Sequence, residues 1–470
     1  MSRIKKTIID NKWACWLALA CLVVPMFASY FFDDMFSSLS PLFNDPGQLE
    51  LGWNSADYGF YASGYSFLCI LGGLVIGGVL LDKYGIRFMG SIFVGMMVGG
   101  AGLVTYAITA GFAPKTSLTV AYIGCMLFGL GSEIAGVAVT RSIAKWFKGK
   151  HMALAMGLQL AIARLGTALA LLVAPMLVTI KNVSHTHTFN GSEWTSAYNN
   201  IYTLGETAKP ALVGMGVLAV GMILWAIFIA MDARFDKEAG TTDKVKTAEE
   251  DKFKFSDIWK ILSNPRFLMI AILCVTFYCC VIRFKKFGSD ILIPLFGVEM
   301  SISSLLLAMI PFFTIVFTPL FGALVDKVGR ATTWMITGAS MVLAAHLIIT
   351  FAPQGQPVFA YIAIGLLGTG YSLVPSAMWP SVAKIVPEKN LGTAYSLIYW
   401  VQNLGMWSVP ILVGNIINGG GSTHSGKVSA ALNAEYVFIL LGVIAVAVAI
   451  MLLRSSKKNP NLGLDLPTSK

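Results

Sequence analysis

The sequence is dominated by apolar stretches of about 20 residues or more, which recur along the whole 470-residue chain. A helix needs about 20 apolar residues to cross the hydrocarbon layer of a membrane. Only 12% of the residues are charged, whereas an ordinary soluble domain contains about 25%. We therefore predict an all-α integral membrane protein.

These stretches divide the chain into twelve candidate transmembrane helices. Glycine is frequent within them, as is usual where membrane helices pack closely against one another. The predicted spans are residues 13–43, 56–81, 87–110, 118–146, 151–180, 208–231, 266–296, 301–325, 331–352, 356–386, 390–418 and 434–454.

The positive charges fall mainly on one side of these spans. The formal net charge is +10, and 26 of the 34 lysines and arginines lie in the two tails and in the loops on the same side. The loops on the opposite side carry four. Cytoplasmic loops of membrane proteins are rich in lysine and arginine, so we expect both termini of this multi-pass protein in the cytoplasm. The basic charge thus indicates topology in a lipid membrane and no nucleic-acid partner.

A charged segment separates two apolar parts of the chain. Residues 232–260 hold fifteen charged side chains, and the segment ends in Phe255-Ser-Asp-Ile-Trp-Lys-Ile-Leu, whose apolar residues recur at helical spacing. We therefore predict an N-terminal six-helix bundle at 1–231, a cytoplasmic linker with a short surface helix at 232–262, and a C-terminal six-helix bundle at 263–470.

The two halves repeat each other in sequence. Phe128-Gly-Leu-Gly-Ser aligns with Leu367-Gly-Thr-Gly-Tyr, and Ser142-Ile-Ala-Lys aligns with Ser381-Val-Ala-Lys, both at an offset of 239 residues. Apolar composition alone rarely maintains one offset across several helices, and internal repeats are typical of secondary transporters. We expect the two bundles to be pseudo-symmetric.

A glycine-aspartate motif occurs once in each half, in the loop after the second helix. Gly78-Val-Leu-Leu-Asp-Lys-Tyr-Gly-Ile-Arg matches Gly322-Ala-Leu-Val-Asp-Lys-Val-Gly-Arg. With these motifs and twelve predicted helices, the chain resembles the major facilitator superfamily over essentially its whole length. The resemblance implies two six-helix bundles that rock about a central substrate site.

The motif residues are candidates for a cytoplasmic gate. The glycines permit close helix contact and a tight turn. Asp82 and Asp326 can approach the positive N-terminus of a helix in the opposite half, which would hold the cytoplasmic side shut. The alternative is that these charges only anchor a loop. The gating candidates are Gly78, Asp82, Lys83, Gly85, Arg87, Gly322, Asp326, Lys327, Gly329 and Arg330.

Two ionisable residues lie near the middle of predicted helices in the first half. Glu133 falls in the fourth span and Arg164 in the fifth, each with small residues on the same helical face. Charges inside a membrane are costly and point to function. The aligned residues of the second half, Ser372 and Asn403, are uncharged. A carboxylate and a guanidinium on neighbouring helices would bind the two ends of a zwitterion; alternatively, they form a buried ion pair that only joins the helices.

The sequences around these residues resemble one branch of the superfamily, the lysosomal dipeptide carriers and their bacterial relatives. The resemblance implies that Glu133 and Arg164 contact the two ends of a peptide. No Asp/Glu-x-x-x-Leu-Leu lysosomal sorting signal occurs in this chain, so we expect the inner (cell) membrane of a bacterium. The segments that carry the resemblance are Phe128-Gly-Leu-Gly-Ser-Glu, Trp146-Phe-Lys-Gly-Lys, Met156-Gly-Leu-Gln-Leu-Ala-Ile-Ala-Arg-Leu-Gly and Tyr30-Phe-Phe-Asp-Asp.

Charged residues also occur in the first and seventh spans. The match of Pro41-Leu-Phe with Pro294-Leu-Phe aligns Asp33 with Lys286, and these two helices face each other in the superfamily. We expect opposite charges to form a gate on the external side, with Asp34 as the aspartate that lines the substrate site. The alternative is that the first helix ends earlier and the charges are solvated. The residues concerned are Asp33, Asp34, Arg283, Lys285 and Lys286.

Polar side chains at helical spacing supply further candidates. Tyr58, Tyr61 and Tyr65 recur in the second span, where the rings can pack while the hydroxyls reach a ligand. Single aromatic residues in membrane helices more often pack or anchor at the lipid interface. The substrate-site candidates are Glu133, Arg164, Asp34, Tyr61, Tyr65, Tyr371, Trp400 and Asn403.

No sequence pattern indicates a metal site, a cofactor or an enzyme. The seven cysteines lie in apolar spans without the spacing of a zinc site. The chain contains no phosphate-binding loop, no His-Glu-x-x-His and no Gly-x-Ser-x-Gly motif. We predict no metal, no cofactor and no catalytic residues.

The predicted function is secondary transport of a small zwitterionic or anionic solute, dipeptides included, by alternating access. We consider protons as a coupling ion and expect a monomer. The alternatives are a membrane sensor or scaffold that has a transporter fold but does not transport, and a carrier for another organic anion.

Overall fold

The computed structural model describes residue 8 and residues 11–44, 51–147, 151–178, 186–189, 194–197, 204–239, 255–387, 390–459 and 463–467. Apart from one two-stranded sheet, the regular structure in these ranges is helical. Twelve of the described segments are long and apolar enough to cross a membrane. The predicted all-α fold with twelve transmembrane helices is confirmed.

The first six spans run from α1 to α7. They comprise α1 (Lys12–Asp34) with the 3-10 helix η2 (Ser37–Asn44); α2 (Ser55–Leu68), the π turn η3 (Cys69–Gly73) and α3 (Leu74–Tyr84); the π turn η4 (Ile86–Gly90) and α4 (Ser91–Thr109); α5 (Pro114–Trp146); α6 (Met152–Leu177); and α7 (Leu204–Ala239). Between α6 and α7, the strands β1 (Thr186–Phe189) and β2 (Trp194–Ala197) pair antiparallel.

The last six spans follow the short helix α8 (Phe255–Leu262). They comprise α9 (Pro265–Tyr278), the π turn η6 (Cys279–Arg283) and α10 (Phe284–Phe296); α11 (Met300–Val328); α12 (Ala331–Phe351); α13 (Pro357–Ile385); α14 (Leu391–Asn418); and α15 (His424–Lys458). Because α7 continues to Ala239, the charged segment that follows residue 231 begins as helix.

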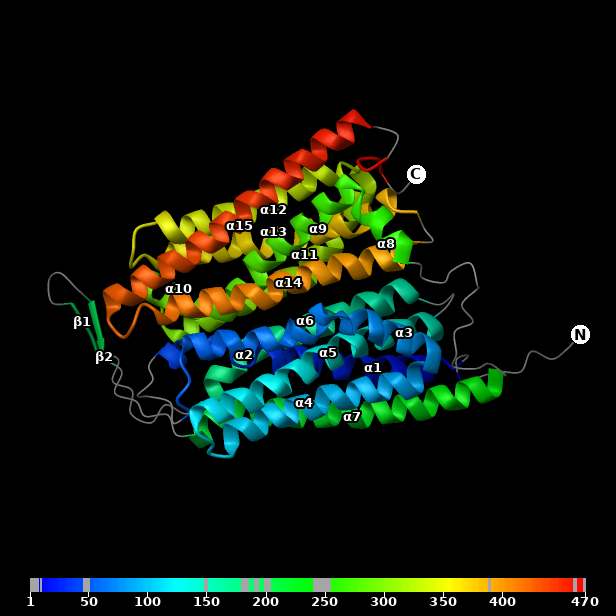
Figure 1. Cartoon of the computed structure of the whole chain (residues 1–470), viewed down its shortest axis with the longest axis horizontal. Coiled ribbons are helices and arrows are strands. Elements are labelled where there is room, and N and C mark those ends of the chain that lie inside the picture. Colours follow the sequence, from blue (N-terminus) through cyan, green and yellow to red (C-terminus); the bar gives the residue numbers. More distant parts are fainter. Residues whose placement is uncertain are drawn as a thin grey trace, which may run out of the picture.

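The helices lie side by side in two groups (Figure 1). The first group, α1 to α7, occupies the lower part of the view, and the second group, α9 to α15, occupies the upper part. Helix α1 begins and α15 ends toward the right, the side on which α8 lies, whereas β1 and β2 lie at the left. We call these the terminal end and the hairpin end of the molecule.

Glycines bring neighbouring helices of each group into backbone contact. A side-chain carbon at Gly124 of α5 would lie 2.7 Å from the carbonyl oxygen of Gly100 in α4. The second group repeats this contact, since a carbon at Gly370 of α13 would lie 2.7 Å from the carbonyl oxygen of Gly338 in α12. Lipid provides no hydrophobic force between helices, so such close packing of small residues holds them together.

The first, second and seventh spans are interrupted. The helix predicted at residues 13–43 ends at Asp34, and the chain continues as η2. The π turns η3 and η6 interrupt the second and seventh spans, and Gly72 within η3 has a φ of 92°. A π turn re-aims the side chains that follow it and occurs often at functional sites.

Side chains from other helices hold the π turns η3 and η6. In η3, the carbonyl of Ile70 accepts a hydrogen bond at 2.8 Å from Nε1 of Trp400, which belongs to the second group. In η6, the carbonyl of Cys280 lies 3.1 Å from Nε2 of His346, whose Nδ1 lies 2.8 Å from the carboxylate of Glu435. His346 and Glu435 are fully buried. The geometry of these two π turns therefore depends on contacts outside their own helices.

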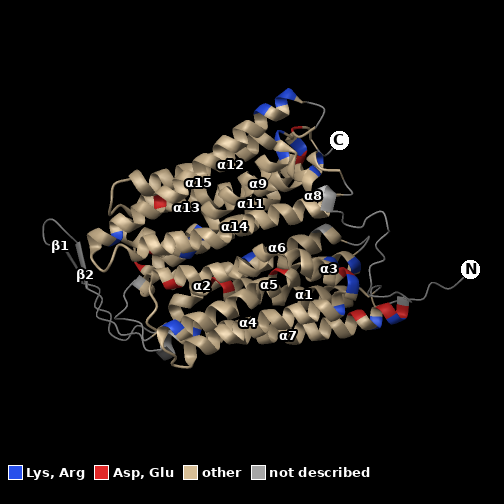
Figure 2. Ribbon diagram, in the orientation of Figure 1, with Lys and Arg blue, Asp and Glu red and all other residues tan. Residues whose placement is uncertain are grey.

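Charged residues gather toward the ends of the helices (Figure 2). The middle of the molecule is mostly uncharged, as expected for segments that lie in hydrocarbon. The few charged side chains between the ends define the site described next.

Candidate substrate site between the two groups of helices

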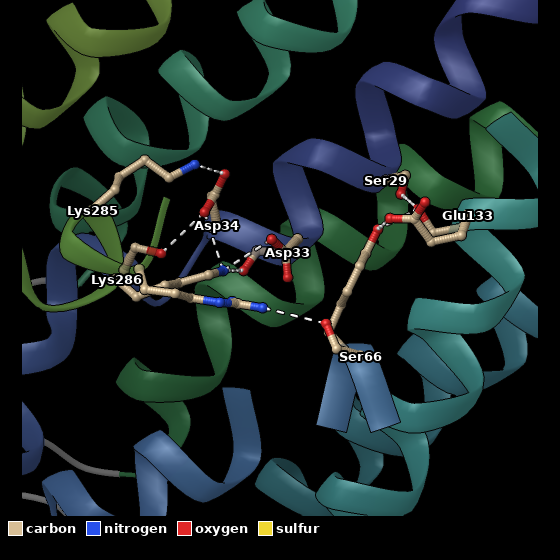
Figure 3. Close-up of polar contacts among 11 residues, drawn as sticks. Ser29, Asp33, Asp34, Ser66, Glu133, Lys285 and Lys286 are labelled. Atoms are coloured by element: carbon tan, nitrogen blue, oxygen red, sulfur yellow. Dashed lines mark hydrogen bonds and ion pairs between the residues drawn. The ribbon is translucent and has the colours of Figure 1, made fainter. Parts of the chain in front are cut away.

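Glu133 lies in α5 and accepts a hydrogen bond from α2, and its neighbour Ser132 contacts α1. Its Oε1 accepts a hydrogen bond at 3.0 Å from the hydroxyl of Tyr65 (Figure 3). The same hydroxyl lies 3.3 Å from the hydroxyl of Ser132, which contacts Ser29 of α1. Helices α5 and α2 approach this closely because Gly129 has no side chain to meet the backbone of Tyr65. The carboxylate is thus positioned where three helices meet.

Arg164 lies in α6 and reaches the second group. Its Nη1 donates a hydrogen bond at 2.8 Å to the hydroxyl of Tyr371 in α13, and its guanidinium carbon lies 5.2 Å from the centre of that ring. At this distance, attraction between cation and ring adds to the hydrogen bond. Gly166 lets α6 pack against the backbone of Phe27 in α1. Arg164 therefore bridges the two groups of helices.

Glu133 and Arg164 do not pair with each other. No ion pair or hydrogen bond joins them in the part of the chain that the structure describes, and each binds a tyrosine instead. Both side chains are partly exposed, although each lies in the middle of a long apolar helix. The second carboxylate oxygen and most guanidinium N–H groups keep hydrogen-bonding capacity. The two charges can therefore accept a further partner.

An ion-pair cluster, formed by Asp33, Asp34, Lys285 and Lys286, joins α1 to α10 (Figure 3). Asp34 lies 2.5 Å from Nζ of Lys285 and 3.1 Å from Nζ of Lys286. Asp33 lies 3.0 Å from Nζ of Lys286. The side chain of Asp34 is 2% exposed, whereas that of Asp33 is 29% exposed. Asp34 is thus enclosed in the cluster, and Asp33 has the more accessible carboxylate.

Tyr61 lies in a buried aromatic cluster. Its ring centre is 5.6 Å from that of Trp53 and 6.4 Å from that of Tyr58. Tyr58 packs against Phe287 of α10 at 5.4 Å, so the cluster also crosses between the groups. In this conformation, the ring of Tyr61 packs against aromatic residues of the first group, and Tyr58 makes the contact with the second group.

The candidates of α14 differ in their surroundings. Trp400 is 39% exposed and donates its indole N–H to η3, as described above. Asn403 is buried, and its amide donates to the carbonyl of Tyr399, one turn earlier in the same helix, at 3.0 Å. Trp400 therefore contacts the first group, whereas the amide N–H of Asn403 is satisfied locally.

An aromatic wall beside Tyr371 was missed in the sequence. The ring of Tyr278 in α9 lies 5.9 Å from that of Tyr371, and its hydroxyl accepts a hydrogen bond from Nε1 of Trp379 at 3.0 Å. Trp379 stacks on Tyr399 of α14 at 5.1 Å. Because the residues come from three helices, no single periodicity groups them. The one available signal was the presence of aromatic residues with polar tips in apolar spans.

The first glycine-aspartate motif is held within the first group. Asp82 forms an ion pair with Arg141 of α5, and Arg87 lies 3.3 Å from Asp236 of α7. Gly85 ends α3 with a φ of 85°, a conformation that favours glycine. The described ion pair of Asp82 is therefore with its own group, and not with a helix of the opposite group.

The second motif is covered by residues near the C-terminal end of the described chain. The N–H of Arg330 donates to the carbonyl of Asp465 at 2.8 Å, and the carboxylate of Asp465 accepts from the N–H of Thr332 at 2.9 Å. Asp465 thereby caps α12, whose first N–H groups lack partners within the helix. Gly329 turns the chain with a φ of 69°. Exposed charged residues in the two motifs are Lys83, Asp326, Lys327 and Arg330.

The groups touch more closely toward the hairpin end than at the motif glycines. A side-chain carbon at Gly78 or Gly322 would meet no atom of the described residues within 4 Å. In contrast, a carbon at Gly414 of α14 would lie 3.0 Å from the Cα atom of Gly59 in α2. The ion-pair cluster and the aromatic cluster add contacts between the groups on the same side as Gly59. We conclude that the described conformation is closed toward the hairpin end.

The site offers one carboxylate, one guanidinium and several tyrosine hydroxyls to a ligand. Within the described ranges, no group of three or more His, Cys, Asp or Glu side chains could hold a metal ion. The arrangement suits a small polar solute that carries both signs of charge.

Comparison with known proteins identifies relatives of this arrangement. The sequence pattern of the Major Facilitator Superfamily matches residues 22–410. The lysosomal dipeptide transporter MFSD1 of Homo sapiens is 30% identical over 405 residues, which cover 84% of this chain and 78% of that protein. The structure of a bacterial homologue of the human lysosomal transporter Spinster aligns with a TM-score of 0.67 at 15% identity, over 96% of this chain and 99% of that chain. A structure of the peptide transporter POT aligns with a TM-score of 0.64 at 14% identity, over 93% of this chain and 95% of that chain.

Proposed function

We propose that this chain, which belongs to the Major Facilitator Superfamily, carries dipeptides and binds them between Glu133 and Arg164. As a member of that family, it is a secondary transporter and not an enzyme. The relative named as a dipeptide transporter, at 30% identity over most of the chain, supports this substrate class. The solved structures, at 14% and 15% identity, support the fold alone.

The observation that carries the proposal is that Glu133 and Arg164, on two helices that both pack against α1, each bind a tyrosine and do not pair with each other among the described residues. A peptide ammonium at Glu133 and a peptide carboxylate at Arg164 would form charge-assisted hydrogen bonds, which are stronger than neutral ones. Tyr65 and Tyr371 orient the two charged side chains before the ligand arrives. Such preorganisation reduces the entropy lost on binding.

Alternating access supplies the transport step. The chain is an integral, multi-pass membrane protein, and its distribution of lysine and arginine supports a terminal end that faces the cytoplasm. In the proposed cycle, the described conformation opens toward the cytoplasm. In the opposite conformation, the glycine-aspartate motifs approach the opposite group of helices, and the ion-pair cluster separates.

Uptake of alanylalanine into proteoliposomes tests the proposed cargo. The free dipeptide should be transported, whereas N-acetylation or C-terminal amidation should each reduce uptake by about tenfold or more, because each removes one charge-assisted contact. Arg164→Lys should be nearly as damaging as Arg164→Ala, since an ammonium loses the planar two-point grip on a carboxylate. Glu133→Gln should make uptake insensitive to acetylation of the amine.

Asn415→Ala serves as the matched control, because Asn415 is exposed, is not a substrate-site candidate and bonds within its own helix. Equal losses for free and blocked dipeptides, in step with a lower melting temperature, would mean that Glu133 and Arg164 only stabilise the fold. Faster uptake of the acetylated dipeptide than of the free one would indicate a carrier of organic anions. Binding of the dipeptide without uptake would indicate a sensor.

A further inference from the structure

Arg283 ends the π turn η6 and is 3% exposed. Its Nη2 lies 3.5 Å from the hydroxyl of Ser66 in the first group, at the outer limit of a hydrogen bond (Figure 3). Its buried Nε has no hydrogen-bond partner among the described residues. A guanidinium does not lose its proton in a protein, so this side chain is a permanent positive charge at membrane depth.

No carboxylate of the described residues forms an ion pair with Arg283. Both aspartates of the ion-pair cluster form ion pairs with the two lysines of the same cluster. Glu133 accepts from Tyr65, and Asp290, two turns further along α10, has a partner of its own. A buried charge without a counter-charge is costly, and in a membrane protein it marks a candidate site for an anion.

The pseudo-symmetry of the chain relates Arg283 to a residue beside the candidate substrate site. In the register that aligns Pro41 with Pro294, Arg283 corresponds to Tyr30 of α1. Tyr30 is partly exposed and lies close enough to both charged residues of the site to interact with them electrostatically. Two related halves present equivalent positions to the site between them, so Arg283 approaches the same region from the second group. Its contact in α2, Ser66, directly follows the tyrosine that binds Glu133.

We propose that Arg283 receives a second carboxylate of the transported molecule, so that the carrier prefers dipeptides with an acidic side chain. This role rests on the proposed function, in which Glu133 and Arg164 take the two ends of the peptide. A neutral dipeptide leaves Arg283 without a counter-charge, whereas an aspartyl or glutamyl side chain supplies one. The planar guanidinium can donate two parallel N–H groups to that carboxylate. The weak contact with Ser66 is readily exchanged for it.

Competition between two dipeptides of nearly the same shape tests this preference. Alanylglutamate and alanylglutamine differ at pH 7 in the charge of one side chain. Each is added as a competitor of labelled alanylalanine uptake by the unaltered protein in proteoliposomes. Alanylglutamate should reach half-inhibition at a concentration about tenfold lower than alanylglutamine, a difference of about 1.4 kcal/mol.

Substitutions at Arg283 then test whether this residue binds the side-chain carboxylate of the dipeptide. Arg283→Gln should abolish the preference for alanylglutamate while it leaves competition by alanylglutamine unchanged. Arg283→Lys keeps the charge but loses the two-point grip, so it should retain part of the preference. Lys285→Gln is the matched control, because Lys285 is a neighbouring buried cation whose carboxylate partner is Asp34. This control should affect both competitors equally.

The possible failures are distinguishable. Equal competition by the two dipeptides in the unaltered protein would overturn the role of Arg283 and leave the proposed function intact. An equal loss for both dipeptides in Arg283→Gln would also overturn it, because a purely structural guanidinium does not distinguish the side chains. If Arg283→Gln does not fold, the competition assay with the unaltered protein and with Arg283→Lys still tests the role of Arg283. If no dipeptide is transported or competes, the proposed function itself fails, and the acidic preference fails with it.

Discussion

Replacing Asp34 with asparagine should favour opening of the hairpin end. The substitution leaves Nζ of Lys285, 2.5 Å away, without its carboxylate, whereas Lys286 keeps Asp33 at 3.0 Å. Removing one partner of a buried ion pair costs about 3–5 kcal/mol. This cost applies to the closed conformation alone, because water hydrates both groups when the hairpin end opens. The equilibrium should therefore shift toward the open conformation by about two orders of magnitude or more.

Asp33→Asn provides the matched control for this substitution. The side chain of Asp33 is 29% exposed, and its partner Lys286 retains Asp34 at 3.1 Å. Solvated ion pairs contribute about 0–1 kcal/mol. The same equilibrium should then shift by about fivefold or less.

Alkylation of an introduced thiol measures the opening. Ser40 of η2 is 1% exposed, and its hydroxyl has no partner within the described residues, so Ser40→Cys is a conservative reporter. All seven native cysteines are buried and should react slowly. A membrane-impermeant maleimide should label the reporter about a hundredfold faster with Asp34→Asn than without it. Equal labelling rates for Asp34→Asn and Asp33→Asn, at unchanged melting temperatures, would refute the reasoning.

Three further substitutions test other parts of the molecule. Asp465→Ala should lower stability by about 1 kcal/mol, because α12 loses its cap; thermal unfolding would reveal this, and Asp465→Asn should preserve most of the stability. Gly414→Ala should lower the free energy of unfolding by about 1–3 kcal/mol, because the added methyl group overpacks against α2, and it should slow transport. Normal uptake and an unchanged melting temperature would argue against the close contact. Asp82→Asn should lower the maximal uptake rate more than the apparent affinity, because Asp82 lies in a terminal-end motif outside the candidate substrate site; a change confined to KM would contradict the gating role.

The twelve spans could be predicted because each must present about 20 apolar residues to lipid. Their internal breaks could not. The π turns depend on Trp400 and His346, which come from helices distant in sequence. Hydrophobic periodicity reports which residues share a helical face, but it does not report contacts of this kind.

The candidate site was predictable in part. Glu133 and Arg164 stand out because charges are rare inside membrane helices. Which tyrosine each one binds depends on how four helices pack, and Tyr371 lies 207 residues from Arg164 in sequence. The cap that Asp465 places on α12 likewise joins residues 133 apart. Such contacts leave no local pattern in the sequence.

The contact between Gly59 and Gly414 sets a length scale for the proposed motion. Gly59 lies near one end of a span that continues to Tyr84, and a helix of roughly 25 residues is about 38 Å long. If the two groups rotate by about 10° around this contact, the far end of such a lever moves by about 7 Å. That displacement approaches the distance of about 8–10 Å between the axes of packed helices. A rigid rotation can therefore separate the groups without unwinding a helix, and a shift of about one ångström near the glycines is multiplied severalfold at the opposite end.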